Sequence, residues 1–259
     1  METEIDTSVY EQEQKLRIRD MLLNALAVSS GAVDAVSFLD LGKVFSAFMT
    51  GNIAFLGLGA ARANGPSMVA VLVAMAGFAV GAYFATRIVK PSEVSGIWSP
   101  RVTVALNISL IAHSVFLAVW FSVSGRPSND VIAVLLGLWG FAMGMQSAAV
   151  RRLHVDGVYT TAATATVMFL AGDLANWSAT KKERRRLFGI LVSLFVGATA
   201  GALLSVHAHI FAPIIPFVIT VAAVATAAFA LGDLDAEGSK EARSSAIGDG
   251  VSGNRNPSR

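Results

Sequence analysis

The chain has 259 residues, of which 54% are hydrophobic and only 15% are charged. Soluble domains carry about a quarter charged residues, so this composition excludes an ordinary soluble domain and indicates a protein embedded in lipid. The formal net charge of +2 is small, and the basic residues are clustered between apolar runs, which argues against nucleic acid as a partner. Cysteine is absent, so disulfides, thiolate catalysis and cysteine-ligated metal are excluded.

Eight apolar segments follow one another along the chain, each close to the ~20 residues that a helix needs to cross a bilayer. They predict an all-α, polytopic transmembrane bundle with segments at about 21–41, 44–62, 66–90, 101–123, 130–150, 157–177, 187–211 and 212–232. Residues 1–20 are too charged for a secretory signal and predict a cytoplasmic N-terminal segment. Residues 233–259 are polar and small and predict a disordered tail.

An internal repeat relates the segment that begins at Gly31 to the segment that begins at Gly144. In this alignment Asp34 faces Ser147, and the run 50–52 faces the run 164–166 after a one-residue gap. Further on, the small residues of 77–81 face those of 197–201, and both runs permit close helix packing in lipid. We therefore predict two halves, at about 21–123 and 130–232, although chance similarity between Ala- and Gly-rich helices is an alternative.

The basic residues distinguish two ways of threading the chain through the bilayer. If all eight segments cross and the N-terminus is inside, several basic residues fall outside, against the positive-inside rule. If segments 44–62 and 157–177 each break midway, or enter and leave on one side, only Lys43, Arg62 and Arg126 lie outside. Each half then contains three crossings, so the halves are inverted relative to one another, as in many secondary transporters. We favour this second arrangement over a plain eight-span protein.

Asp34 is the central candidate for chemistry. It lies about 14 residues beyond Asp20, so at ~1.5 Å per residue it sits roughly 20 Å along its helix, within the ~30 Å hydrocarbon core. A carboxylate at that depth costs at least ~2.5 kcal/mol, and such groups usually face a cavity or a partner. We predict that Asp34 binds a proton or a cation that drives transport. A buried structural hydrogen bond is the alternative.

Thr50, Gly51 and Asn52 interrupt an apolar stretch and predict a helix break, in which Thr or Asn caps a half-helix that can hold an anionic or polar group. The second half offers a comparable hydroxyl cluster at 160–166, where Ala165 replaces the glycine, so its break should be milder. The alternative is that these side chains only join helices by hydrogen bonds. The complete predicted substrate or ion site is Asp34, Thr50, Gly51, Asn52, Gln146, Ser147, Thr161, Thr164 and Thr166.

Other polar residues predict no further chemistry. Asp173 lies near the basic run 181–186 and is predicted to pair with a Lys or Arg. His207 and His209 have no additional metal-ligand cluster beside them, so we expect no metal. The sequence has no catalytic triad, HExxH or phosphate-binding glycine loop. We therefore expect that the protein is not an enzyme and that it binds no cofactor.

Three stretches together resemble a known family: 31–39 (GAVDAVSFL), 45–52 (FSAFMTGN) and 157–161 (GVYTT). They are similar to the YoaK-like family of uncharacterised bacterial inner-membrane proteins, which carry the domain of unknown function 1275. The resemblance covers essentially residues 20–232, and it departs from the family's second motif at Ala165, where glycine is usual. It implies a multi-pass protein of the bacterial inner membrane, and it names no activity.

These observations together predict a secondary transporter or permease for a small solute of unknown identity. A passive channel would use the same polar lining, and a non-transporting scaffold or signalling protein would fit the charged N-terminal segment and polar tail. The expected partners are the lipid bilayer and the unknown small molecule or ion, and association into homo-oligomers is left open.

Overall fold

The computed structural model describes residues 2–89, 97–153, 155, 161, 163–176 and 180–230, and these residues form helices joined by short connections. Within these described ranges, six helices are long and apolar enough to cross a membrane, and two shorter apolar helices accompany them. The elements are α1 (Glu2–Asp40), α2 (Met49–Ala60), α3 (Met68–Ile88), α4 (Pro100–Ser122), α5 (Asn129–Arg151), α6 (Ala163–Asn176), α7 (Lys181–His207) and η2 (His209–Phe211). The last candidate span, His209–Ala230, includes η2. The predicted all-α polytopic bundle is confirmed.

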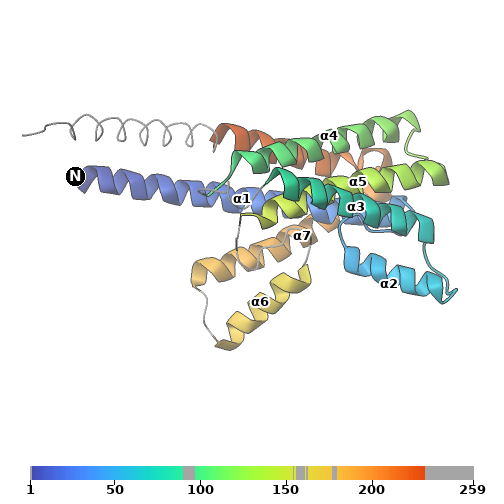
Figure 1. Ribbon diagram of the computed structural model, residues 1–259, viewed down its shortest axis with the longest axis horizontal. Helices are drawn as coiled ribbons and strands as arrows, with labels where there is room; N and C mark the ends of the chain where they lie inside the picture. Colours follow the sequence, from blue (N-terminus) through green and yellow to red (C-terminus); the bar gives the residue numbers. More distant parts are fainter. Residues whose placement is uncertain are drawn as a thin grey trace, which may run out of the picture.

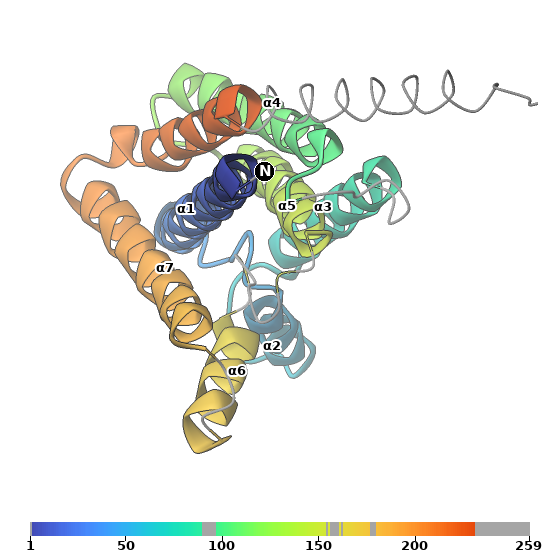
Figure 2. The same ribbon diagram turned by 90° about the vertical axis from the view of Figure 1, so that its left-hand side faces the viewer.

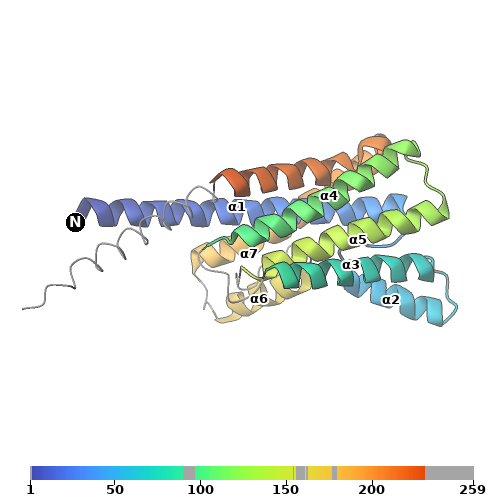
Figure 3. The same cartoon turned by 45° about the horizontal axis from the view of Figure 1, so that its top comes forward.

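The long helices run side by side and alternate in direction, whereas α2 and α6 begin near the middle of the bundle and run toward opposite ends (Figures 1 and 3). Seen from one end, α1 and α5 lie innermost (Figure 2), and their apolar windows are 61% and 50% buried. The alternation brings the start of α4, the end of α5 and the start of α7 to one end of the bundle, together with their basic residues. This arrangement of six long helices and two short ones agrees with the second threading.

Several predicted boundaries need correction. Residues 41–48 are not helical, so only the second part of segment 44–62 forms a helix. The charged residues from Glu2 onward belong to α1 instead of preceding it. The tail 233–259 lies outside the described residues.

The basic run 181–186 was predicted to separate two helices, but it forms the first turns of α7. Thr180 and Glu183 make a reciprocal capping box, in which Glu183 Oε2 accepts from the Thr180 N–H at 2.8 Å. This cap satisfies helix-end donors that would otherwise be unpaired, and it starts the helix before the apolar stretch begins. Arg184 then pairs with Asp173 of α6, with a distance of 2.6 Å from Nε to Oδ2, which confirms the predicted ion pair for Asp173.

Glycines set the closest helix contacts. A Cβ atom on Gly144 of α5 would overlap the Phe78 carbonyl of α3, and one on Gly81 would overlap the Phe141 carbonyl of α5. A Cβ atom on Gly197 of α7 would likewise overlap the Val28 carbonyl of α1. Without side chains at these positions the backbones approach closely, which supplies the van der Waals contact that holds helices together in lipid. The predicted small-residue faces are therefore confirmed as packing faces.

Replacing Gly144 by Ala should lower the free energy of unfolding by about 1–3 kcal/mol, because the new methyl group meets backbone that cannot move aside. Gly57 of α2 provides the matched control, since a Cβ atom there meets nothing within 4 Å. Thermal unfolding of the two purified variants in detergent checks this prediction. Equal melting temperatures for Gly144→Ala and Gly57→Ala would contradict the proposed close contact.

Candidate functional site

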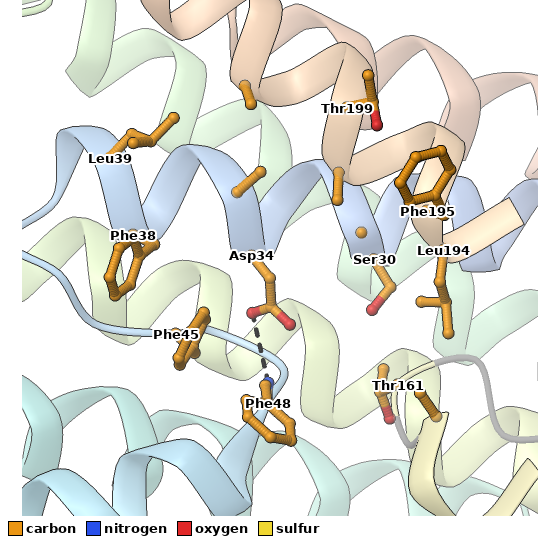
Figure 4. Close-up of a pocket in the computed structure, with 15 residues that line it drawn as sticks. Ser30, Asp34, Phe38, Leu39, Phe45, Phe48, Thr161, Leu194, Phe195 and Thr199 are labelled. Atoms are coloured by element: carbon orange, nitrogen blue, oxygen red, sulfur yellow. Dashed lines mark hydrogen bonds between the residues drawn. The ribbon is translucent and has the colours of Figure 1, made fainter. Parts of the chain in front are cut away.

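A cavity of about 540 Å³ lies between α1, the residues that precede α2, the start of α6 and α7. Most of its wall is aromatic or aliphatic, and Phe38, Phe45, Phe48 and Phe195 contribute rings to it (Figure 4). Its polar side chains are Ser30, Asp34, Thr161 and Thr199. Its volume and mixed lining are typical of a small-molecule pocket, which has a mainly apolar wall and a few polar groups that orient the ligand.

The Asp34 carboxylate joins α1 to the non-helical residues before α2. Its Oδ1 atom accepts hydrogen bonds from the backbone N–H groups of Ser46, Ala47 and Phe48, at 3.0, 2.7 and 3.3 Å. Phe48 is the N-cap of α2 and has no side-chain cap, so Asp34 supplies negative charge where the helix dipole is positive. The sequence predicted that a half-helix here can hold an anionic group, and the group it holds is the protein's own Asp34.

The other carboxylate oxygen is not used in this cap. Oδ2 accepts no hydrogen bond from the residues that the structure describes, and the side chain points from α1 toward Phe48 and the cavity (Figure 4). Asp34 therefore has one oxygen committed to the fold and one available to a ligand. The two alternatives raised for Asp34, a structural hydrogen bond and a binding role, are compatible in this geometry.

The prediction that Thr50, Gly51 and Asn52 form a helix break is wrong. α2 already begins at Met49, and the break precedes it at 41–48. Asn52 is fully buried, and its amide accepts from the Phe45 N–H at 3.1 Å and donates to the Phe45 carbonyl at 2.7 Å. Gly51 lies beneath the rings of Phe45 and Phe48, while Thr50 is exposed. Asn52 and Gly51 therefore hold the non-helical residues 41–48 in position. Of this region, the neighbouring Phe45 and Phe48 line the cavity, whereas Thr50, Gly51 and Asn52 do not.

The second-half residues occupy different positions. Ser147 Oγ lies 2.9 Å from Thr161 Oγ1 and donates to the Met143 carbonyl at 2.6 Å. Gln146 is buried and donates from Nε2 to the Leu26 carbonyl of α1 at 3.1 Å. Thr166 is also buried, whereas Thr164 is exposed. The milder break predicted around Ala165 is not present, because residues 164–166 already belong to α6, which begins at Ala163; Thr160 itself lies outside the described residues.

Of the predicted set, Asp34 and Thr161 line the cavity, Ser147 contacts Thr161, and the others lie behind the wall or outside it. Sequence reasoning missed the contribution of α7, including Leu194, Phe195 and Thr199. The glycine run at 197–201 was the signal that could have indicated it. A helix that packs closely on α1 through these glycines also borders the cavity beside Asp34. Among the described residues, no three His, Asp or Glu side chains gather closely enough to hold a metal ion.

Replacing Asn52 by Ala should lower the free energy of unfolding by about 1–3 kcal/mol, because the half-buried N–H and carbonyl of Phe45 lose the buried amide that pairs with them. The neighbouring exposed change Thr50→Ala should stay within about 0.5 kcal/mol of the native protein. Thermal unfolding of both variants in detergent measures the difference. A native melting temperature for Asn52→Ala would show that the side chain does not hold the break in place.

Comparison with known proteins agrees with this architecture. Residues 22–227 match the family model described as "Protein of unknown function (DUF1275)". The chain is 32% identical over 167 residues to the UPF0700 transmembrane protein YoaK of Bacillus subtilis (strain 168), an alignment that covers 64% of this chain and 72% of that protein. No solved structure matches the chain. The chain therefore belongs to the DUF1275 family, and it is a multi-pass transmembrane protein.

Proposed function

We propose that this protein is a secondary transporter for a small solute, and that Asp34 couples solute movement to a proton or a cation. One observation carries the proposal: a carboxylate within a candidate span holds the start of a half-length helix with one oxygen and faces a cavity with the other. Ionisable groups at membrane depth usually mark a substrate or ion path.

The hydrogen bonds of Asp34 provide a route from ion binding to movement. The ionised carboxylate attracts the three N–H groups of residues 46–48 and the positive end of α2. A proton or cation on Asp34 neutralises that charge and weakens these hydrogen bonds. Binding of a proton or cation in the cavity is thereby linked to the position of α2. A two-state mechanism requires such a ligand to bind one arrangement of the helices more tightly than the other.

The packing of the long helices supports an inverted repeat. In the sequence alignment, α1 and α5 are the first helices of the two halves, and α3 and α7 are the third. The glycine contacts pair α5 with α3 and α1 with α7. The first helix of each half therefore packs closely on the third helix of the other half. The polar contacts follow the same alignment, because Asp34 bonds to Ala47 while Ser147 meets Thr161.

The two half-length helices support alternating access. α2 and α6 begin near the middle of the bundle and run to opposite ends (Figure 1), the geometry expected where broken helices surround a central site. Because the cavity wall is aromatic and aliphatic around a single carboxylate, we expect a mainly apolar solute that carries a hydrogen-bond donor or a positive charge. Such a solute would bind its polar end at Asp34 and its apolar body among the phenylalanines.

Transport should depend on the Asp34 charge and not merely on its hydrogen-bonding shape. Asp34→Asn keeps an oxygen that can accept from residues 46–48 but loses the charge, so uptake driven by an inward proton gradient should fall roughly tenfold or more, as expected for losing an interaction of about 1.5–3 kcal/mol. Compounds that raise the melting temperature of the purified protein define the solutes to test, and proteoliposome uptake measures their transport. Asp40→Asn removes a carboxylate from the same helix outside the cavity and should transport normally.

The other outcomes distinguish the alternatives. Uptake that persists in Asp34→Asn and without a gradient would indicate a passive channel. No uptake of any stabilising compound, by a protein with a native melting temperature, would indicate a scaffold or signalling role.

We also propose that the N-terminus and the basic end of the bundle face the cytoplasm of a bacterial inner membrane, since basic residues are retained on that side. The chain has no cysteine, so single exposed cysteines report topology directly. An impermeant maleimide applied to intact cells should label Asn64→Cys and leave Lys181→Cys unlabelled until the cells are opened. The reverse labelling pattern would overturn the orientation.

A further inference from the structure

A second cavity, of about 440 Å³, lies between α1 and the first turns of α7, separate from the cavity at Asp34. Lys182, Arg185 and Arg186 of α7 line it, opposite Asp20 and Asn24 of α1. These residues belong to the end of the bundle where the other basic helix ends gather (Figure 1). The basic run therefore borders a hollow in the structure instead of covering a flat surface.

The charge of this cavity is positive and not balanced by its own carboxylate. Asp20 already pairs with Arg19, at 3.0 Å from Oδ1 to Nη2. The nearby Glu183 does not line the cavity, and although its charge also acts on Arg186, its carboxylate accepts from the backbone and the hydroxyl of Thr180 in the helix cap. Arg186 Nε is buried and has no hydrogen-bond partner among the described residues. Buried donors are nearly always paired in native proteins, so an unpaired guanidinium nitrogen beside this cavity points to an anionic ligand.

The apolar residues beside the cavity identify what kind of anion fits. Phe188 and Val192 line it one and two turns beyond the basic residues, toward the centre of the span, and they are 59% and 41% exposed. The apolar window of α7 is the least buried of the six candidate spans, at 22%. A positive rim at the start of a candidate span, beside an exposed apolar wall, matches a phosphate joined to acyl chains.

We infer that this cavity binds an anionic phospholipid from the leaflet that meets the basic end of the bundle. The phosphate lies among Lys182, Arg185 and Arg186, and it supplies the partner that Arg186 Nε lacks. The acyl chains run along Phe188 and Val192. The inference does not depend on the proposed transport, because it uses none of the residues that surround Asp34.

Native mass spectrometry of the full-length protein in detergent tests the inference with three probes: phosphatidylglycerol, phosphatidylcholine and inorganic phosphate. The native protein should retain phosphatidylglycerol preferentially. Lys182→Gln with Arg185→Gln changes two exposed side chains, and it should weaken phosphatidylglycerol binding roughly fivefold for each side chain removed. Arg186→Gln should weaken it similarly.

The matched control removes the same charge from the same end of the bundle. Lys181→Gln with Arg151→Gln alters two exposed basic residues that do not line the cavity, and it should leave binding within about twofold of native. Equal losses in the two double variants would reduce the effect to general surface charge and overturn the site. Equal retention of phosphatidylcholine would also overturn it, and binding of inorganic phosphate as tight as that of the lipid would identify a free-anion site instead.

Discussion

The interaction on which the rest of this structure depends is the triple hydrogen bond from the backbone of residues 46–48 to one oxygen of Asp34. Within a bilayer, neither an isolated carboxylate nor unpaired backbone N–H groups can be left without partners. Each therefore satisfies the other, and the charge is further stabilised by the positive end of α2. The same contact determines where the non-helical residues turn, where α2 begins and where Phe45 and Phe48 lie, so it builds one wall of the cavity that Asp34 itself faces.

The opposite wall comes from close packing. Because α7 meets α1 through Gly31 and Gly197 without intervening side chains, it carries Phe195 and Thr199 to the edge of the same cavity. The second cavity, lined by Lys182, Arg185 and Arg186, lies between the same two helices, nearer the end where α7 begins. The pair α1 and α7 thus borders both cavities, and a lipid bound at the end of this pair would act on the helices that form the central site.

Sequence reasoning succeeded for the helical bundle, and it was less accurate for the roles of individual polar residues. Asp34, Ser147 and Thr161 lie where the two half-length helices begin. Asn52 and Gln146 were assigned to the same lining but instead hold backbone groups of Phe45 and Leu26. A polar residue in an apolar segment signals that it needs a partner in lipid, but it does not tell whether that partner is a ligand or the protein's own backbone.

By itself the sequence determined that the chain is a multi-pass helical membrane protein, because apolar length and the distribution of charge respond directly to the thickness and polarity of the bilayer. The division into long and half-length helices was favoured by the charges but was decided by the tertiary structure. Only the tertiary structure decided which groups Asp34 bonds to, which helix closes the cavity opposite it, and that the basic run borders a hollow. Backbone N–H groups occur at every residue except proline, and glycine contacts depend on which helices are neighbours. These choices are made by the packing of distant segments, which no local pattern records.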